Sequence, residues 1–381
     1  MGKITEKESF KSTRCAECCP ECDGIVKTFL LEKDDGSIQV EISNFGGTIL
    51  AVRTPDKSGH VADIALGVSD SIRGWMEQEH PYFGSTVGRV CNRIHGGEFP
   101  LEGKTVQVSK NENGVTTLHG GFRGFSDHIW RVDTENTCAV PGEHSTLTLV
   151  RTSKNGEEGF PGELCVRAEY TLTEWNELRI LFTAELVGDA VPATVVNMTN
   201  HLYLNLSGKG SQTTILDHAL RLNAQKYTPL DEKLATPKGP IESLIGTHLD
   251  FYTAPKKIGA EIEDPRNEPF RGYDHNFVLG WREGDGVDEE VPAHLNFAAE
   301  LSHEESGRSV KVFTTQPAIQ VYTGNYLGGV QCRDGSKYQK WAGVALETQH
   351  SPDSPNHSNF PSITLRAGEK FREETWFVFN K

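Results

Sequence analysis

Four polar segments of this chain combine His, Asp or Glu with residues that favour turns: residues 118–121, 199–201, 273–276 and 346–349. A His near its ordinary pKa of about 6.5 can gain or lose a proton at neutral pH, and a nearby carboxylate can carry out the opposite transfer. Because the segments lie far apart in the sequence, only folding can bring them together. Their composition therefore indicates acid/base chemistry at a site assembled from distant elements.

Glu347 and His201 are the candidates for a proton-transfer pair. Glu347 follows an apolar, strand-like run at residues 342–346, a setting that disfavours an unpaired charge and would raise the pKa of the carboxyl group. His201 follows a second strand-like run at residues 193–197. Each has a plainer interpretation, because Glu347 could face water at a strand end and His201 could be a buried imidazole held by a hydrogen bond.

Three further residues offer ligand contacts. His119 opens a glycine-rich segment at residues 119–125, which permits tight turns and close approach of a ligand. Asp274 could accept hydrogen bonds from a polyol, although a single Asp also commonly forms turns. Arg93 carries a planar set of donors that suits neighbouring hydroxyls or a carboxylate. A solvent-facing loop for His119 and a structural salt bridge for Arg93 remain open alternatives.

The cysteines fall into two groups. Cys15, Cys18, Cys19 and Cys22 crowd together near the N-terminus, whereas Cys91, Cys138, Cys165 and Cys332 are scattered. Four thiolates can bind Zn²⁺, but structural zinc sites usually separate two cysteine pairs by about a dozen residues or more, and here the pairs abut. We therefore predict no metal site, and we interpret residues 1–24 as an appended tail that is either redox-sensitive or merely flexible.

The charge balance narrows the range of partners. The 381 residues include 53 acidic and 38 basic side chains, giving a formal charge of −15 that repels nucleic acid and anionic lipid. A neutral small molecule is the favoured ligand. No run of about 18 apolar residues occurs, and the charged N-terminal segment does not resemble a secretory signal, so we expect a cytoplasmic protein.

Short alternating or apolar runs bounded by Gly, Asn, Asp and Pro predict a chain built from strands. Residues 164–172 and 178–186 should form a hairpin, residues 310–313 and 318–322 a second pair, and residues 375–379 a closing strand. Other expected strands are residues 38–42, 48–52 and 146–150, and one short helix is expected at residues 70–77 with Ser69 or Asp70 as its cap.

No internal repeat or linker divides the chain after residue 24. The acidic stretch at residues 283–290 is best interpreted as a surface loop. We therefore predict one domain over residues 25–381. Phosphate-binding P-loop, dinucleotide GxGxxG, GxSxG and HExxH motifs are missing from the sequence, which argues against the commonest nucleotide, serine-hydrolase and zinc-protease interpretations.

Taken together, the polar motifs resemble those of the aldose 1-epimerase family, the galactose mutarotases. The matching segments occur in the family's order, at residues 81–84, 88–94, 118–125, 197–201, 273–276, 322–325 and 346–349. The resemblance implies an all-β fold, a large antiparallel β-sandwich of the galactose mutarotase-like supersandwich type. It also implies an open sugar cleft on one sheet and no cofactor.

The same resemblance implies roles for individual residues. Glu347 would remove the proton of the C1 hydroxyl, His201 would protonate the ring oxygen, and His119 would assist at that oxygen. Hydroxyl groups of the sugar would be held by Arg93, Asn92, Asp274 and Gln320. The implied enzyme would interconvert the anomers of free hexoses such as galactose and glucose, and a monomer is the default expectation.

Two other functions remain open at this point. A catalytically silent carbohydrate-binding protein could use the same scaffold, because sugar contacts do not require an acid and a base. Glycoside hydrolysis by Glu347 and Asp274 would need a similar pair of carboxyl groups.

Overall fold

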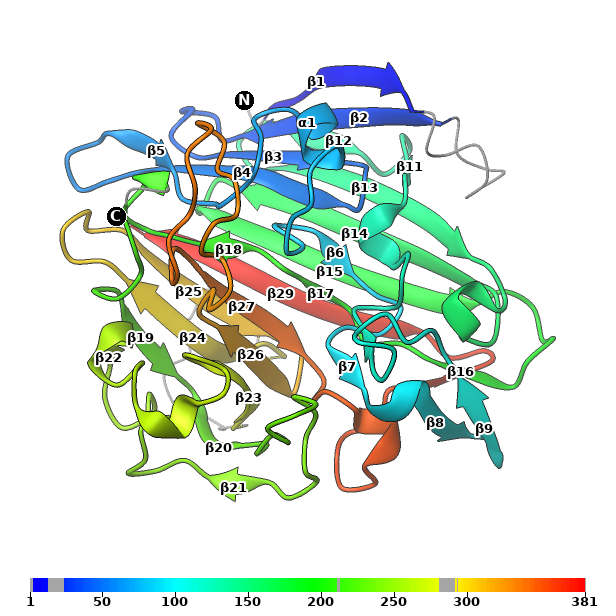
Figure 1. Ribbon diagram of the computed structural model, residues 1–381. Helices are drawn as coiled ribbons and strands as arrows, with labels where there is room; N and C mark the ends of the chain where they lie inside the picture. Colours follow the sequence, from blue (N-terminus) through cyan, green and yellow to red (C-terminus); the bar gives the residue numbers. More distant parts are fainter. Residues whose placement is uncertain (1–2, 13–23, 211–212, 281–291, 293, 381) are drawn as a thin grey trace.

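Nearly all regular structure in this protein is antiparallel β-sheet, which confirms the predicted all-β sandwich class. The fold is seen in a computed structural model that describes residues 3–12, 24–210, 213–280, 292 and 294–380 (Figure 1). Three larger sheets of five, ten and six strands contain most of the strand residues. The expected surface loop at residues 283–290 lies outside the described residues.

The first sheet is the blue layer at the top of Figure 1. Its strands follow one another in sequence order: β1 (Lys3–Lys11), β2 (Ile25–Glu32), β3 (Gln39–Ser43), β4 (Thr48–Pro55) and β5 (Val61–Asp63). The expected strands at residues 38–42 and 48–52 are thereby confirmed to within a few residues.

Strand β1 corrects one expectation. Residues 3–11 were assigned to a flexible tail, but they pair with β2 from Lys3 opposite Glu32 to Lys11 opposite Ile25. The tail interpretation is wrong here because an edge strand is held by backbone hydrogen bonds and needs few apolar side chains. Phe10 is one such side chain, since it packs against a cluster of buried residues. The four crowded cysteines lie outside the described residues.

The second sheet is the largest and forms one whole layer. Its strands in spatial order are β11 (Arg131–Val132), β13 (His144–Ser153), β14 (Leu164–Thr173), β15 (Glu177–Leu186), β29 (Phe371–Asn380), β25 (Ser309–Thr314), β24 (Asn296–Ser302), β19 (Ala219–Leu222) and β22 (Lys256–Lys257), with β12 (Cys138–Val140) on β13. The predicted hairpin is confirmed as β14 and β15, which pair from Leu164 opposite Leu186 to Leu172 opposite Leu178.

The third sheet carries two of the polar segments singled out above, residues 273–276 and 346–349. Its strands in spatial order are β18 (Tyr203–Leu204), β27 (Val344–Gln349), β26 (Ala318–Tyr322), β23 (Asp274–Leu279), β20 (Ala224–Tyr227) and β21 (Glu242–Ser243). An isolated bridge between Ala65 and Leu204 links this sheet to the first one. The two smaller sheets thus form the layer that faces the ten-stranded sheet.

One apolar core joins the layers. Ile319 and Val321 of β26 belong to the same buried cluster as Val312 of β25 and Phe377 of β29. β25 and β26 therefore lie in different sheets, and the expectation that residues 310–313 and 318–322 pair with each other is wrong. Both strands are apolar enough to face the core, so their sequences do not reveal which neighbour each will take.

Short elements fill the edges of the sandwich. Helix α1 (Ile72–Met76) confirms the predicted helix, although its cap is Ser71, which accepts a hydrogen bond from the Gly74 N–H. The short strands are β6 (Thr86–Val87), β7 (Arg93–Ile94), β8 (Glu98–Leu101), β9 (Lys104–Gln107), β10 (Thr117–Leu118), β16 (Ala193–Val195), β17 (Thr199–Asn200) and β28 (Thr364–Arg366). Among the described residues, no helix has the length and hydropathy needed to cross a membrane.

Candidate active site

The face of the third sheet that points away from the core brings three predicted residues together. In the strand register, Gln320 lies opposite Glu347 on one side and opposite Asn276 on the other. Alternate residues of a strand point to opposite faces, so Gln320 and Glu347 share the face that the core residue Ile319 avoids. Asp274 starts β23 on this face, and its Oδ1 accepts a hydrogen bond of 2.6 Å from Gln320 Nε2.

His201 meets Glu347 at this face. It follows β17, where its N–H donates to the Ser85 carbonyl and its own carbonyl accepts from the Gly84 N–H. The His201 Nε2 atom lies 3.6 Å from Glu347 Oε1. His201 and Glu347 are only 5% and 2% exposed, so the alternative in which Glu347 faces water at a strand end is wrong.

His119 reaches the same pocket from the turn after β10. Its ring centroid lies 5.4 Å from that of His201, and the side chain is buried, so the solvent-facing alternative is wrong. The turn requires glycine at position 120, because φ is +89° there and a Cβ added to Gly120 would lie 2.0 Å from the Gly88 carbonyl oxygen. The peptide N–H of Asn92 donates to His119 Nδ1 at 3.2 Å.

Arg93 lines the pocket and is also part of a salt bridge. Its Nε and one terminal nitrogen donate to the two carboxylate oxygens of Glu112 at 2.8 and 2.7 Å. The Thr116 hydroxyl donates a further bond of 2.6 Å to this carboxylate. The structural interpretation of Arg93 is therefore confirmed, and it coexists with a place beside the pocket.

Several tyrosines complete the pocket, and the sequence interpretation did not assign them to the site. The cavity has a volume of about 150 Å³ and is lined by Pro81, Tyr82, Asn92, Arg93, Leu118, His119, His201, Tyr203, Asp274, Gln320, Tyr322, Tyr326 and Glu347. Tyr82 contacts His119 edge to face at 4.6 Å, and Tyr203 stacks on His201 at 4.7 Å between centroids. Tyr82 lies inside one of the motifs described above, so the sequence did contain a signal that could have assigned this tyrosine to the site.

Burial sets the electrostatics of the proton-transfer pair. Burial, together with the nearby charge of Asp274, raises the pKa of Glu347 well above its usual range. Burial lowers the pKa of His201 to about 3. Burial also raises the pKa of Asp274, against the opposing effect of Arg93. The charged forms of all three groups are thus destabilised in the pocket, as expected where a low dielectric replaces water.

Three buried atoms of the pocket have no hydrogen-bond partner among the described residues: Glu347 Oε2, Gln320 Oε1 and His201 Nδ1. An unsatisfied buried polar atom costs about 1–3 kcal/mol. Hydroxyl groups both donate and accept hydrogen bonds, so a ligand rich in hydroxyls would satisfy atoms of both kinds.

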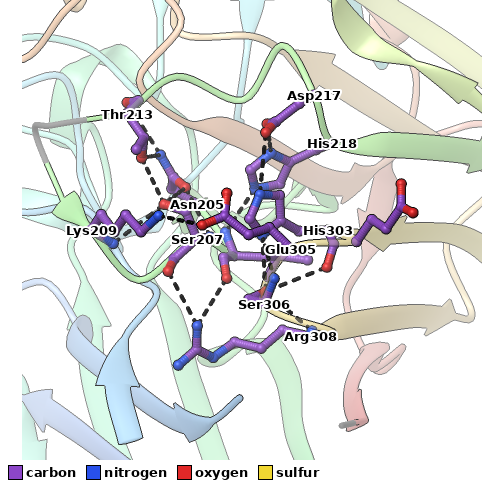
Figure 2. Close-up of polar contacts among 12 residues, drawn as sticks. Asn205, Ser207, Lys209, Thr213, Asp217, His218, His303, Glu305, Ser306 and Arg308 are labelled. Carbon is purple, nitrogen blue, oxygen red and sulfur yellow. Dashed lines mark hydrogen bonds and ion pairs between the residues drawn. The ribbon is translucent and has the colours of Figure 1, made fainter. Parts of the chain in front are cut away.

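A second cluster of metal-binding residue types lies outside the pocket. Asp217, His218 and His303 come close enough to hold an ion, and Figure 2 shows them beside Ser306 and Arg308. The Leu206 N–H donates to His218 Nε2 at 2.9 Å, so the imidazole proton lies on Nδ1, 3.0 Å from Asp217 Oδ1. This nitrogen has no lone pair for a metal, and we interpret the cluster as a structural hydrogen-bond network.

Gly120→Ala should destabilise the fold more than Gly114→Ala does. Both glycines have positive φ, which costs an L-residue about 1–2 kcal/mol, but a Cβ at Gly114 would have no atom within 4 Å. The clash with the Gly88 carbonyl should add at least about 1 kcal/mol for Gly120→Ala. Chemical unfolding of the two variants measures the difference, and equal losses would contradict the close approach of the two backbones.

The fold and the site together define an enzyme of the acid/base class, in which a carboxylate and an imidazole share a small pocket of hydrogen-bonding groups. Residues 27–378 match the profile of the family described as Aldose 1-epimerase. The chain belongs to this family of isomerases.

Individual relatives agree with the family assignment. The chain is 39% identical to galactose mutarotase of Sus scrofa over 362 residues, which cover 95% of this chain and 96% of the relative. It is 35% identical to aldose 1-epimerase of Escherichia coli over 360 residues, covering 94% and 96%. A crystal structure of galactose 1-epimerase from Lactobacillus acidophilus superimposes with a TM-score of 0.77 at 25% identity, covering 100% of this chain and 99% of that one.

Proposed function

We propose that this protein is an aldose 1-epimerase that interconverts the α and β anomers of free hexoses such as galactose and glucose. The observation that carries the proposal is the 3.6 Å approach of His201 Nε2 to Glu347 Oε1 in a pocket of about 150 Å³. The names of the relatives in Sus scrofa and Escherichia coli support the same activity.

The reaction needs two proton transfers. Glu347 takes the proton of the C1 hydroxyl, the electron pair of that O–H bond forms the C1 carbonyl, and the bond between C1 and the ring oxygen breaks. His201 supplies a proton to the ring oxygen as it leaves. After rotation about the C1–C2 bond, the ring oxygen attacks the other face of the carbonyl, and the two groups exchange roles.

The pKa directions in the empty pocket favour these transfers. Raising the pKa of Glu347 makes its carboxylate a stronger base, and lowering the pKa of His201 makes its imidazolium a stronger acid. In the empty pocket the same directions leave His201 neutral and the proton of the pair on Glu347, so ring opening requires that this proton first pass to His201, whose Nε2 lies 3.6 Å from Glu347 Oε1. Once the proton is on His201, burial favours its return to Glu347 through the sugar, which is the direction that opens the ring.

Other residues hold the sugar. We assign hydroxyl contacts to Arg93, Asn92, Asp274 and Gln320, and we assign to His119 a contact at the ring oxygen. The orphan oxygen of Gln320 and the position of Arg93 in the lining of the pocket support this assignment. The chemistry consists of proton transfers alone, so we propose that no cofactor or metal takes part.

The silent carbohydrate-binding alternative is less well supported. Sugar recognition alone gives no reason to bury an unpaired carboxylate oxygen beside an imidazole of lowered pKa. Glycoside hydrolysis would require Asp274 as a second reactive carboxyl group, but its Oδ1 is held at 2.6 Å by Gln320. Release of reducing sugar from a disaccharide would revive that alternative.

Polarimetry tests the proposed activity directly. Freshly dissolved α-galactose or α-glucose should reach its equilibrium optical rotation faster when micromolar protein is present than in buffer alone. The Glu347→Gln variant, which keeps the shape of the side chain, serves as the matched control and should leave the spontaneous rate nearly unchanged. An unchanged drift with the native protein would favour mere binding.

Phosphorylated hexoses should be poor substrates. Among the described residues that line the pocket, Arg93 is the one Lys or Arg, and Glu112 already holds its guanidinium in a two-point bond. A phosphate group would therefore enter a partly negative pocket in which no Lys or Arg among the described lining residues is free to pair with it. Comparison of galactose with glucose 6-phosphate at equal concentration measures this preference, and faster turnover of the phosphate ester would contradict it.

Three further expectations from the sequence belong to this proposal. We propose that residues 25–381 act as one catalytic domain, that the protein works in the cytoplasm, and that it is a monomer. The continuous match to the family over residues 27–378 supports the first of these.

A further inference from the structure

His119 and Asn92 hold each other through two reciprocal hydrogen bonds. The main-chain N–H of His119 donates to the Asn92 carbonyl at 3.0 Å, and the Asn92 N–H donates to His119 Nδ1 at 3.2 Å. Both residues have left-handed backbones, with φ 52° for His119 and φ 56° for Asn92. Such backbones persist only where the surrounding structure fixes them, so this pair is a rigid element of the pocket.

The second of these bonds decides where His119 carries its proton. A ring nitrogen that accepts a hydrogen bond uses its lone pair, so a neutral imidazole must then be protonated on the other nitrogen. In His119 the accepting atom is Nδ1, which leaves the proton on Nε2. Since Nδ1 faces the Asn92 peptide, Nε2 is the nitrogen that remains for the pocket which His119 lines.

We propose that the peptide N–H of Asn92 fixes His119 as the Nε2–H tautomer, so that His119 is a permanent hydrogen-bond donor toward the bound aldose and never a base. Asn92 is then a positioning residue that acts through its backbone. The part of this inference that concerns the aldose rests on the proposed function, whereas the tautomer itself does not.

The tautomer has two chemical consequences. A second basic imidazole would compete with Glu347 for the C1 hydroxyl proton, whereas a fixed N–H donor can only stabilise negative charge as it develops on oxygen. His119, His201 and Glu347 also lie close enough to hold a metal ion. An ion bound at Nε2 would displace the proton to Nδ1, where it would face the Asn92 N–H, so the same bond disfavours metal binding.

A charged His119 would meet the same obstacle. Protonation of Nδ1 would place two N–H groups against each other, and burial of the ring beside His201 and Arg93 lowers the pKa of His119 well below its ordinary range. The neutral Nε2–H form should therefore persist throughout the working range of the enzyme.

Long-range ¹H–¹⁵N NMR of the full-length protein with ¹⁵N-labelled histidine tests the inference without reference to activity. The His119 ring, assigned by its loss in His119→Gln, should show a protonated Nε2 and an unprotonated Nδ1 from about pH 5 to about pH 9. A protonated Nδ1, or a ring that titrates in this range, would overturn the proposal. Failure here leaves the proposed epimerase activity untouched, because polarimetry measures that separately.

The Asn92→Gly variant separates the backbone of Asn92 from its side chain. Glycine accepts a positive φ and retains the peptide N–H, so the NMR signature of His119 should be the same as in the native protein. A changed tautomer in this variant would show that the side chain, and not the peptide, holds the ring, and would overturn the backbone role.

Kinetics of His119 variants test the donor role. The His119→Gln side chain can place an amide N–H near the position of Nε2, whereas His119→Leu has no donor. Loss of one donor to a developing oxyanion typically costs about 10²-fold in kcat or more, so His119→Leu should fall by about that factor and His119→Gln by clearly less. Equal losses in kcat for the two folded variants would contradict a donor role.

Discussion

Glu347→Gln and His201→Asn are each expected to lower kcat by at least about 10²-fold while the protein remains folded. Each substitution keeps a hydrogen-bonding side chain but removes the group that transfers the proton. Because the two groups act on one substrate in the same step, the double variant should be little worse than the poorer single variant. Polarimetry at saturating galactose gives kcat, and circular dichroism reports whether each variant is folded.

Matched controls distinguish chemistry from general disturbance. Glu242→Gln changes an exposed carboxylate on the edge strand β21 of the same sheet, and His60→Asn changes an exposed imidazole in the turn between β4 and β5. Both control variants should keep nearly native turnover. Near-normal kcat in Glu347→Gln or His201→Asn would remove that residue from the proposed mechanism.

Acid should destabilise the folded protein well above the pH at which carboxylates are normally protonated. Burial lowers the pKa of His80, His128 and His218 to about 4, and it lowers the pKa of His201 and His275 to about 3. These rings stay neutral in the folded state, whereas the unfolded chain protonates them near pH 6.5. The unfolded state therefore binds more protons below that pH, and the free energy of unfolding falls as the pH falls.

Raised carboxyl pKa values work in the opposite direction. Burial raises the pKa of Asp63, Asp274, Glu347 and Asp353, so these groups take up protons in the folded state first and stabilise it as the pH falls. The histidines that shift outnumber these carboxyl groups among the described residues. Each net proton taken up on unfolding changes the free energy of unfolding by about 1.4 kcal/mol per pH unit. We expect the chain to take up at least about one net proton when it unfolds.

Urea unfolding at a series of pH values from about 7 to about 5 measures this slope. The His80→Phe variant is the matched control, because His80 packs against Trp75 and Phe83 and its Nδ1 has no hydrogen-bond partner among the described residues. Because it lacks this one titrating ring, the variant should have a slope smaller than that of the native protein by up to about 1.4 kcal/mol per pH unit. A free energy of unfolding that does not vary over this pH range would contradict the buried neutral histidines.

The sequence predicted the local elements well where neighbours in the chain are also neighbours in space. The hairpin of β14 and β15 is an example, because two alternating runs joined by a short turn pair with each other. The same reasoning failed for β25 and β26, which are also close in sequence but join different sheets. Strand β1 was missed because backbone pairing at a sheet edge leaves little trace in side-chain pattern.

By itself, the sequence determined the residue types of the site and their order along the chain. A carboxylate after an apolar run at Glu347 and an imidazole after another at His201 already indicated proton transfer. Only the tertiary structure decided that they meet, because their approach depends on the pairing of β27 with β26 and on the turn after β17. The pKa of each group and the orientation of the His119 ring depend on burial and on neighbours from distant segments, and residue type alone fixes neither.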